Sequence, residues 1–205
     1  MTDRRAHWEQ IYASRRPDAV SWFQAKAEPS LGLIGRTGAG PPSRLVDVGG
    51  GASPLAAGLV AQGWRAPTVL DIAEAALAAA REAAGPAAAS VDWVAADVLD
   101  WRPAEPFDLW HDRAVFHFLT EADDRARYRA TLAAALRPDG WLILAAFAPD
   151  GPEICSGLPV QRWSAAGLEA ELGEGYALRH TLDETHTTPW GAGQKFTWTL
   201  FQRLA

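Results

Sequence analysis

The stretch from residue 44 to 59, RLVDVGGGASPLAAGL, constrains the fold of this chain more than any other part of the sequence. An apolar run over 45–48 predicts a buried strand, and three glycines follow at 49–51. Glycine lacks a Cβ, so the backbone there can adopt positive φ and a ligand can lie directly against it. Ser53 and Pro54 then indicate a helix start, because serine caps helices and proline fits the first helical position. A strand, a glycine turn and a helix in this order present free backbone amides and a helix N-terminus to a nucleotide-like ligand.

The chain after the glycine turn alternates predicted strands and helices. Strands are expected at residues 68–72, 91–95, 107–110 and 141–147, helices at 54–62, 73–84, 121–136 and 164–172, a turn at 137–140 and an irregular segment at 149–159. Two long β-like runs, 176–187 and 194–204, predict a closing antiparallel hairpin. Together they predict an α/β fold, a Rossmann-like three-layer sandwich whose seven-stranded sheet is mostly parallel with an antiparallel C-terminal strand.

The region before the first strand is predicted to form a separate helical part. We expect an N-terminal helical lid over residues 1–43 and a ligand-binding domain over residues 44–205. Short helices are expected at 7–12 and 31–34, with Trp22 between them. Aromatic residues before a ligand-binding sheet are typical of a lid, and equally of a cap that only covers the sheet.

Acidic residues stand where the next strands end. Asp71 follows the glycines by about 20 residues, the offset at which an acidic side chain meets ribose hydroxyls in nucleotide-binding βαβ units. The alternative interpretation is that Asp71 caps the following helix. Asp97 ends the next strand, and right-handed crossovers bring all of these strand ends to one rim of the sheet.

Composition excludes several classes of partner. The formal net charge is −6, which argues against unspecific nucleic-acid binding. No apolar run approaches the roughly 18 residues of a membrane span, and no signal-peptide core is recognisable at the start of the sequence. Cys155 is the single cysteine, so no internal disulfide and no cysteine-built zinc site is expected. We therefore expect a cytoplasmic protein without a metal, a nucleic-acid partner or a membrane partner.

The ordered set of motifs resembles the class I, seven-β-strand family of S-adenosylmethionine-dependent methyltransferases. DVGGG at 47–51 is similar to the acidic-x-Gly-x-Gly signature of that family. LDI at 70–72, ADV at 96–98, FDLWHD at 107–112 and LRPDGWLIL at 136–144 resemble its next landmarks, in the right order. The resemblance covers about residues 44 to 204 and implies S-adenosylmethionine as the cofactor and methyl transfer as the activity.

The resemblance also implies roles for individual residues. Asp47 and the glycines would hold the methionine part of the cofactor, Asp71 the ribose, and Asp97 with the Val98 amide the adenine. His111 would lie near the methyl group and Trp22 would cover it. The cofactor-binding residues expected on this basis are Trp22, Asp47, Gly49, Gly50, Gly51, Ser53, Asp71, Ile72, Asp97, Val98 and His111.

The leader HWEQIY…SWF and the end of the fourth strand are similar to the branch of lysine methyltransferases that act on translation elongation factors. That branch typically has Asp-Lys-Gly-Thr where this chain has Asp112, Arg113, Ala114 and Val115. The acceptor would be a small molecule or a protein side chain. If its nucleophile carries a proton, a base must hold or remove that proton, and Asp112 and His117 are the candidates because both follow the fourth strand. A structural cap for Asp112 and a packing role for His117 are the alternatives.

Two other classes of protein would share parts of this pattern. A nicotinamide-dependent dehydrogenase would also use the glycines and Asp71, but Pro54 occupies the position of the third glycine of its fingerprint. A non-catalytic nucleotide-binding protein could keep the glycine turn without an acceptor pocket.

Overall fold

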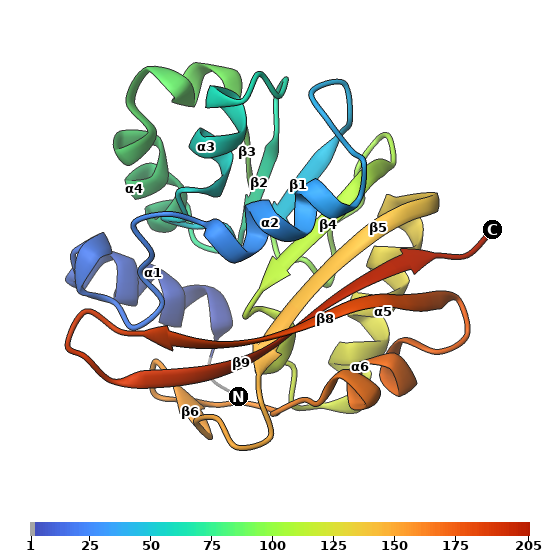
Figure 1. The fold of residues 1–205 in the computed structure, drawn as a ribbon. Helices are drawn as coiled ribbons and strands as arrows, with labels where there is room; N and C mark the ends of the chain where they lie inside the picture. Colours follow the sequence, from blue (N-terminus) through green and yellow to red (C-terminus); the bar gives the residue numbers. More distant parts are fainter. Residues whose placement is uncertain (1–2) are drawn as a thin grey trace.

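A computed structural model describes residues 3–205, and it shows a twisted sheet between two layers of helices (Figure 1). The sheet strands run in the order β3-β2-β1-β4-β5-β9-β8. Their bounds are β1 Leu45–Val48, β2 Thr68–Asp71, β3 Asp92–Ala95, β4 Phe107–Arg113, β5 Leu136–Phe147, β8 Tyr176–Thr187 and β9 Gly193–Arg203. Strands β1 to β5 pair in parallel, β9 is antiparallel to β5, and β8 is antiparallel to β9. The predicted α/β sandwich with a mostly parallel sheet is confirmed.

Helices cover both faces of the sheet and bury a hydrophobic core on each. The helices are α1 Arg4–Ser14, α2 Glu28–Arg36, α3 Leu55–Ala61, α4 Glu74–Ala84, α5 Ala122–Ala135 and α6 Ala165–Leu172, with short 3-10 turns η1 Pro17–Ala19, η2 Gly85–Ser90 and η3 Phe116–Phe118. On one face α2 and α3 bury Leu33 and Leu55 against Ile143 of β5, with α4 beside them. On the other face Tyr128 of α5 packs with Leu142 of β5, and α6 adds to the same cluster. Burial of these side chains supplies most of the drive to fold.

Strand β4 extends three residues past its predicted end, and this decides where the following side chains point. It reaches Arg113 and pairs with β5 up to Ala145. Successive side chains of a strand point to opposite faces. His111 accordingly faces α2, where it contacts Ser30, while Asp112 faces α5, where it contacts Tyr128.

Strand β5 contains the turn predicted at 137–140. Leu136 pairs with Phe107, and the next pair joins Trp141 to Leu109, so the four residues between them bulge out of the ladder. Asp139 within the bulge has φ 60. The sequence signal for a turn was correct, but the strand begins before the turn rather than after it.

The segment predicted to be irregular at 149–159 contains a small hairpin. Strands β6 Ile154–Cys155 and β7 Leu158–Pro159 pair antiparallel. Ser156 and Gly157 join them, both with positive φ, which suits a tight two-residue hairpin turn.

The two N-terminal helices have different environments. Helix α2 buries Leu33 and Ile34 in the core of the sheet face that it covers. Helix α1 buries no residue fully, and it lies away from that layer, beside α4 and near the tip of the β8–β9 hairpin (Figure 1). Only α1 of the two is therefore in the position of a lid.

Candidate active site

A cavity of about 850 Å³, counted to its open mouth, lies at the carboxyl ends of β1, β2, β3 and β4. Parallel strands of α/β sheets bind ligands at this edge. Its walls come from the strand ends and from α1, and its lining residues are Arg4, Trp8, Tyr12, Trp22, Val48, Gly49, Leu70, Asp71, Ile72, Ala96, Asp97, Val98, Arg113, Ala114, Val115, Phe118, Leu119 and Cys155.

A second cavity of about 480 Å³ lies beside the glycine turn. Among its lining residues are Asp47, Gly50, Ser53 and His111. The residues that line both cavities are Tyr12, Trp22, Gly49 and Arg113. The two cavities therefore meet between the glycine turn, the end of β4 and the N-terminal aromatic residues.

The glycine turn has no room for side chains. Gly49 has φ 64, and a Cβ there would collide with the side chain of Val115. Gly51 has φ 35, and its Cβ would lie 2.6 Å from the Tyr12 hydroxyl oxygen and 3.1 Å from Asp71 Oδ2. Positive φ strains residues with a Cβ, so both positions require glycine for conformation as well as for space.

Asp71 lies at the end of β2 with its side chain nearly buried. Its Oδ1 accepts a hydrogen bond from the backbone N–H of Ala73 at 2.9 Å. Burial raises the pKa of Asp71 to about 7, although backbone N–H groups, including that of Gly51, act in the opposite direction. Ribose hydroxyls could donate to a carboxylate at this position, as the sequence predicts, and the bond to Ala73 also shows the capping contact that was the alternative.

Asp47, His111 and Ser30 form a buried chain of polar contacts. His111 Nδ1 lies 2.7 Å from Asp47 Oδ1, and His111 Nε2 lies 2.9 Å from Ser30 Oγ. The Asp47 carboxylate accepts from Nδ1, so in a neutral ring Nε2 accepts from the serine hydroxyl. Asp47 Oδ2 is buried without a hydrogen-bond partner among the described residues. A buried unpaired carboxylate oxygen is costly, and a cationic ligand group beside it would remove that cost.

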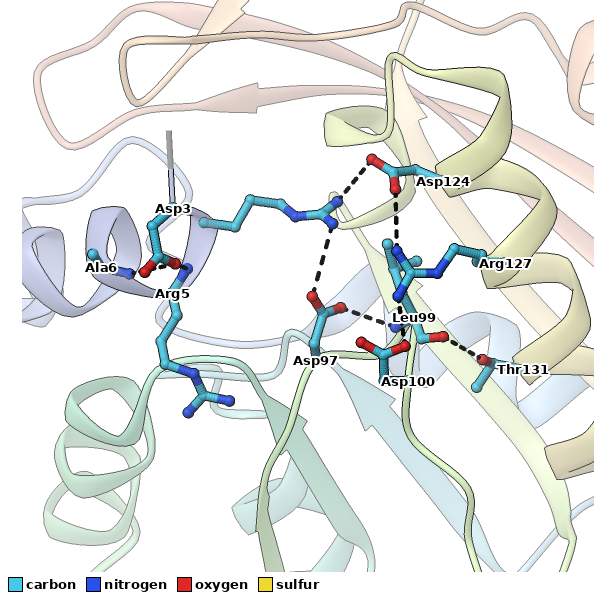
Figure 2. A network of polar contacts seen from close by, with 10 residues as sticks. Asp3, Arg5, Ala6, Asp97, Leu99, Asp100, Asp124, Arg127 and Thr131 are labelled. Atoms are coloured by element: carbon cyan, nitrogen blue, oxygen red, sulfur yellow. Dashed lines mark hydrogen bonds and ion pairs between the residues drawn. The ribbon is translucent and has the colours of Figure 1, made fainter. Parts of the chain in front are cut away.

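Asp97 follows β3 and is tied both to its own loop and to α1. Its Oδ1 accepts from the backbone N–H of Leu99 at 2.9 Å. Arg4 Nη2 lies 3.8 Å from Asp97 Oδ2, and Arg4 Nη1 donates to Asp124 Oδ2 at 3.1 Å. Figure 2 shows Asp97 and Asp124 facing each other from the β3 loop and from α5. The first turn of α1 is thus anchored across the mouth of the larger cavity.

Further contacts hold α1 over the strand ends. Both carboxylate oxygens of Glu9 accept from backbone N–H groups at the start of α4, Glu74 at 2.7 Å and Ala75 at 3.1 Å. A carboxylate at a helix N-terminus is favoured by the unpaired N–H groups and the helix dipole. Trp8 packs edge-on against Phe118 and Trp22, at ring distances of 5.1 and 5.8 Å. Aromatic rings therefore line the outer wall of the larger cavity.

Asp112 lies away from both cavities. Its side chain is fully buried, where Oδ2 accepts from the Tyr128 hydroxyl at 2.6 Å and Oδ1 accepts from the Val115 N–H at 2.8 Å. Burial raises the pKa of Asp112 to about 6, although the Tyr128 hydroxyl and the amides of Val115 and Phe116 lower it. The structure does not bring this predicted base to the cavity, because β4 continues to Arg113 and directs Asp112 toward α5. The carboxylate instead caps the turn after β4.

His117 also lies outside both cavities. The η3 turn buries its ring fully between Phe118 and Phe147, at ring distances of 4.4 and 4.7 Å. Burial and the nearby Arg113 charge lower the pKa of His117 to about 3. The packing interpretation therefore fits His117 better than a catalytic one.

The predicted cofactor-binding residues surround the two cavities. Trp22, Gly49, Asp71, Ile72, Asp97 and Val98 line the larger one, and Trp22, Asp47, Gly49, Gly50, Ser53 and His111 line the second. Gly51 is packed beneath Tyr12. Tyr12, Arg113 and Cys155 also line the larger cavity, and no sequence motif predicted a place for them there.

Residues 3–205 contain neither a metal-binding cluster nor a membrane-spanning helix. No group of three or more His, Cys, Asp or Glu residues there is arranged to hold a metal ion. No helix in the same range is both long and apolar enough to span a membrane.

Comparison with known proteins defines the class of the site. Residues 45–140 match the family model described as "Methyltransferase domain". An S-adenosylmethionine-dependent methyltransferase from Anabaena variabilis superposes with a TM-score of 0.78 at 14% identity, over 99% of this chain and 96% of that one. The family match is confined to residues 45–140, and the fold of nearly the whole chain is the one seen in S-adenosylmethionine-dependent methyltransferases. The predicted fold class is confirmed.

Particular relatives narrow the comparison. The chain is similar to thiocyanate methyltransferase 1 of Arabidopsis thaliana, 34% identical over 139 residues. That match covers 66% of this chain and 59% of the relative, so the chain spans less than two thirds of its length. A 1,6-didemethyltoxoflavin-N1-methyltransferase of Burkholderia thailandensis, solved with that acceptor and S-adenosylhomocysteine, superposes with a TM-score of 0.74 at 21% identity, covering 98% of this chain and 88% of that one.

Proposed function

We propose that this chain transfers the methyl group of S-adenosylmethionine to a small nucleophile bound under α1. The observation that carries the proposal is the cavity at the carboxyl ends of β1 to β4, where the bare backbone of Gly49 and the carboxylates of Asp71 and Asp97 share one wall. A nicotinamide cofactor or a purely binding role is supported by no comparable feature of the described residues.

The residues present suit this cofactor. Asp71 would accept from the ribose hydroxyls, and Asp97 with the Val98 amide would meet the adenine edge. The unpaired Oδ2 of Asp47 would accept from the methionine ammonium group, which gives a partner to an otherwise orphaned buried oxygen. When bound, S-adenosylmethionine supplies an electrophilic methyl group on a positively charged sulfur. The glycine turn at 49–51 allows the backbone to approach it closely.

We narrow the lid from the expected 1–43 to the part of the chain around α1 and the strap at Ser21 and Trp22. The strap is held at two points, since His186 Nε2 lies 2.8 Å from the Ser21 carbonyl and Arg113 Nη1 donates to the Trp22 carbonyl at 3.0 Å. Closing this lid would exclude water from the site and hold the acceptor in line with the methyl group. These two effects supply most of the rate acceleration of such a displacement. Arg4 and Glu9 would hold the closed position.

The acceptor that we favour is a small molecule. The Arabidopsis relative is named for thiocyanate, and the Burkholderia enzyme was solved with a small heterocycle. Neither predicted base, Asp112 or His117, lines a cavity. His111 lines the second cavity, but both of its ring nitrogens are engaged, one with Asp47 and one with Ser30. An acceptor that reacts without losing a proton therefore suits the site best. A protein lysine, as in the branch that the leader resembles, is the alternative, and a cytoplasmic location stays a prediction.

The test is a methyl-transfer assay with labelled S-adenosylmethionine. The purified chain would be offered sodium thiocyanate, small thiols, small amines and a cytosolic protein extract in separate reactions. We expect transfer to a small-molecule acceptor and calorimetric binding of S-adenosylhomocysteine. Label in the protein fraction alone would favour the lysine alternative, and binding of NADH without S-adenosylhomocysteine would contradict the proposed cofactor.

A further inference from the structure

The guanidinium of Arg113 is a charged group whose hydrogen-bonding capacity is largely unused. Nη1 donates to the Trp22 carbonyl, but Nε and Nη2 are buried without any partner among residues 3–205. The group stacks over the Phe196 ring, with Cζ 4.9 Å from the ring centroid. Arginine is well suited to such stacking, but a ring face cannot accept the in-plane N–H bonds that a guanidinium offers.

The acidic side chains nearby are engaged elsewhere. Glu184 Oε2 accepts from the Trp198 indole N–H at 2.7 Å, and Asp47 is bound to His111. Burial lowers the pKa of Arg113, while the charges of Glu184 and Asp47 raise it. A buried cation without a hydrogen-bonded counter-charge is unfavourable, and an anionic ligand bound beside it would remove that cost.

The position of Arg113 is where a ligand can reach it. It lines both cavities and stands where they meet, beside Gly49 and Trp22. Nε and Nη2 form one edge of the planar guanidinium. Two N–H groups along that edge match the two-point geometry with which arginine binds carboxylates and other small anions.

We propose that Arg113 binds the anionic group of the methyl acceptor, so that the acceptor is a small anion; this rests on the proposed methyl transfer. A lone pair of the anion forms the new bond to the methyl carbon, and the carbon–sulfur bond of the sulfonium breaks with its electron pair going to sulfur. An anionic acceptor becomes a neutral methylated product, and the sulfonium becomes a neutral thioether. No proton leaves, which agrees with Asp112 and His117 lying outside the cavities.

A second anionic group could bind Arg113 instead of the acceptor, because the methionine part of the cofactor also carries a carboxylate. The two possibilities predict that replacing Arg113 weakens the binding of different ligands. If Arg113 holds the acceptor, its replacement weakens binding of the anion and leaves the cofactor product almost unaffected. If it holds the cofactor carboxylate, its replacement weakens S-adenosylhomocysteine but not 5′-methylthioadenosine, which lacks the amino-acid end.

The experiment uses calorimetry on the full chain with Arg113→Met, Arg113→Lys and the control Arg179→Met, a replacement on the exposed face of β8. Sodium thiocyanate is titrated into protein saturated with S-adenosylhomocysteine. We expect Arg113→Met to weaken thiocyanate roughly 10- to 100-fold, as for loss of charge-assisted hydrogen bonds. Binding of S-adenosylhomocysteine should change less than about threefold, and Arg179→Met should behave as the unaltered chain does.

Arg113→Lys keeps the charge without the paired N–H groups, and we expect an intermediate affinity for thiocyanate. It also keeps the test decisive if Arg113→Met fails to fold. Unchanged thiocyanate binding in both variants, no thiocyanate binding by the unaltered chain, or a loss confined to S-adenosylhomocysteine would each overturn the proposal. Loss of thiocyanate binding on Arg113 replacement in a chain that binds no S-adenosylhomocysteine would instead refute the proposed function and leave the anion site standing.

Discussion

Replacing Asp71 by asparagine tests the ribose assignment with little change of shape. The amide oxygen of Asn can still accept from the Ala73 N–H, which the carboxylate accepts at 2.9 Å. What is lost is the negative charge and one of two acceptors for the ribose hydroxyls. Hydrogen bonds to charged groups are worth about 1.5–3 kcal/mol, so we expect S-adenosylhomocysteine to bind roughly 10- to 150-fold more weakly.

The pKa of Asp71 adds a second, independent signature. With a pKa of about 7 the carboxyl group is roughly 9% ionised at pH 6 and 91% at pH 8. Ribose hydroxyls donate to the ionised form, so cofactor affinity should rise about tenfold over this interval. The folded pKa lies above the ordinary value, so the contribution of Asp71 to the free energy of unfolding of the ligand-free chain should fall as pH rises from about 4 to about 7 and then level off. Asp71→Asn should abolish the trend in cofactor affinity and remove this contribution from the pH dependence of stability.

The assay is calorimetric titration with S-adenosylhomocysteine at pH 6, 7 and 8, with thermal melting of the ligand-free protein at each pH. Asp92→Asn serves as the matched control, because Asp92 is exposed on β3 and lines neither cavity. Equal affinity and equal pH dependence for Asp71→Asn and the unaltered chain would refute the reasoning.

Three further changes test other parts of the site. Gly49→Ala should lower the melting temperature and prevent cofactor binding, because its Cβ would collide with Val115 at φ 64; Gly85→Ala, with φ 54 and open space around it, should cost only about 1–2 kcal/mol of strain in chemical denaturation. Arg4→Gln should speed release of S-adenosylhomocysteine by less than about fivefold in stopped-flow fluorescence, since its ion pairs are partly exposed, and added salt should shrink that difference. His117→Phe should keep the methyl-transfer rate and its pH profile, because a buried ring with a pKa of about 3 does not titrate near neutrality; loss of the acidic limb of the profile would contradict this.

The local periodicity of the sequence was enough to predict the sheet. The glycine turn, the alternation of β and α segments and the closing hairpin each carry short-range signals, and the predicted architecture follows from them. The ends of the strands were harder to predict from the sequence. The bulge at 137–140 looks like the end of a connection, and only pairing of Leu136 with Phe107 shows that β5 has already begun.

The residues of the candidate site also differ in how well the sequence predicts their positions. Residues at the ends of β1, β2 and β3 could be placed on one rim because their strands are short and their motifs are local. Asp112 and His117 could not, since the three added residues of β4 direct Asp112 toward α5, and the η3 turn then buries His117. Tyr12 owes its position to the packing of α1 over the glycine turn, and Arg113 bonds to the strap; no local pattern encodes either contact.

Arg113 lines both cavities, reaches the strap through Nη1 and leaves its other edge without a hydrogen-bond partner among the described residues. Recognition of an acceptor and sealing of the chamber are consequently functions of one side chain. A compound that occupies the unpaired edge would also hold the guanidinium in the position from which it bonds to the strap, whereas a compound that leaves this edge empty would not add that restraint. We expect such a protein to discriminate between competing acceptors mainly by how long the lid remains closed over each of them. Direct contacts to the groups that distinguish these acceptors should matter less.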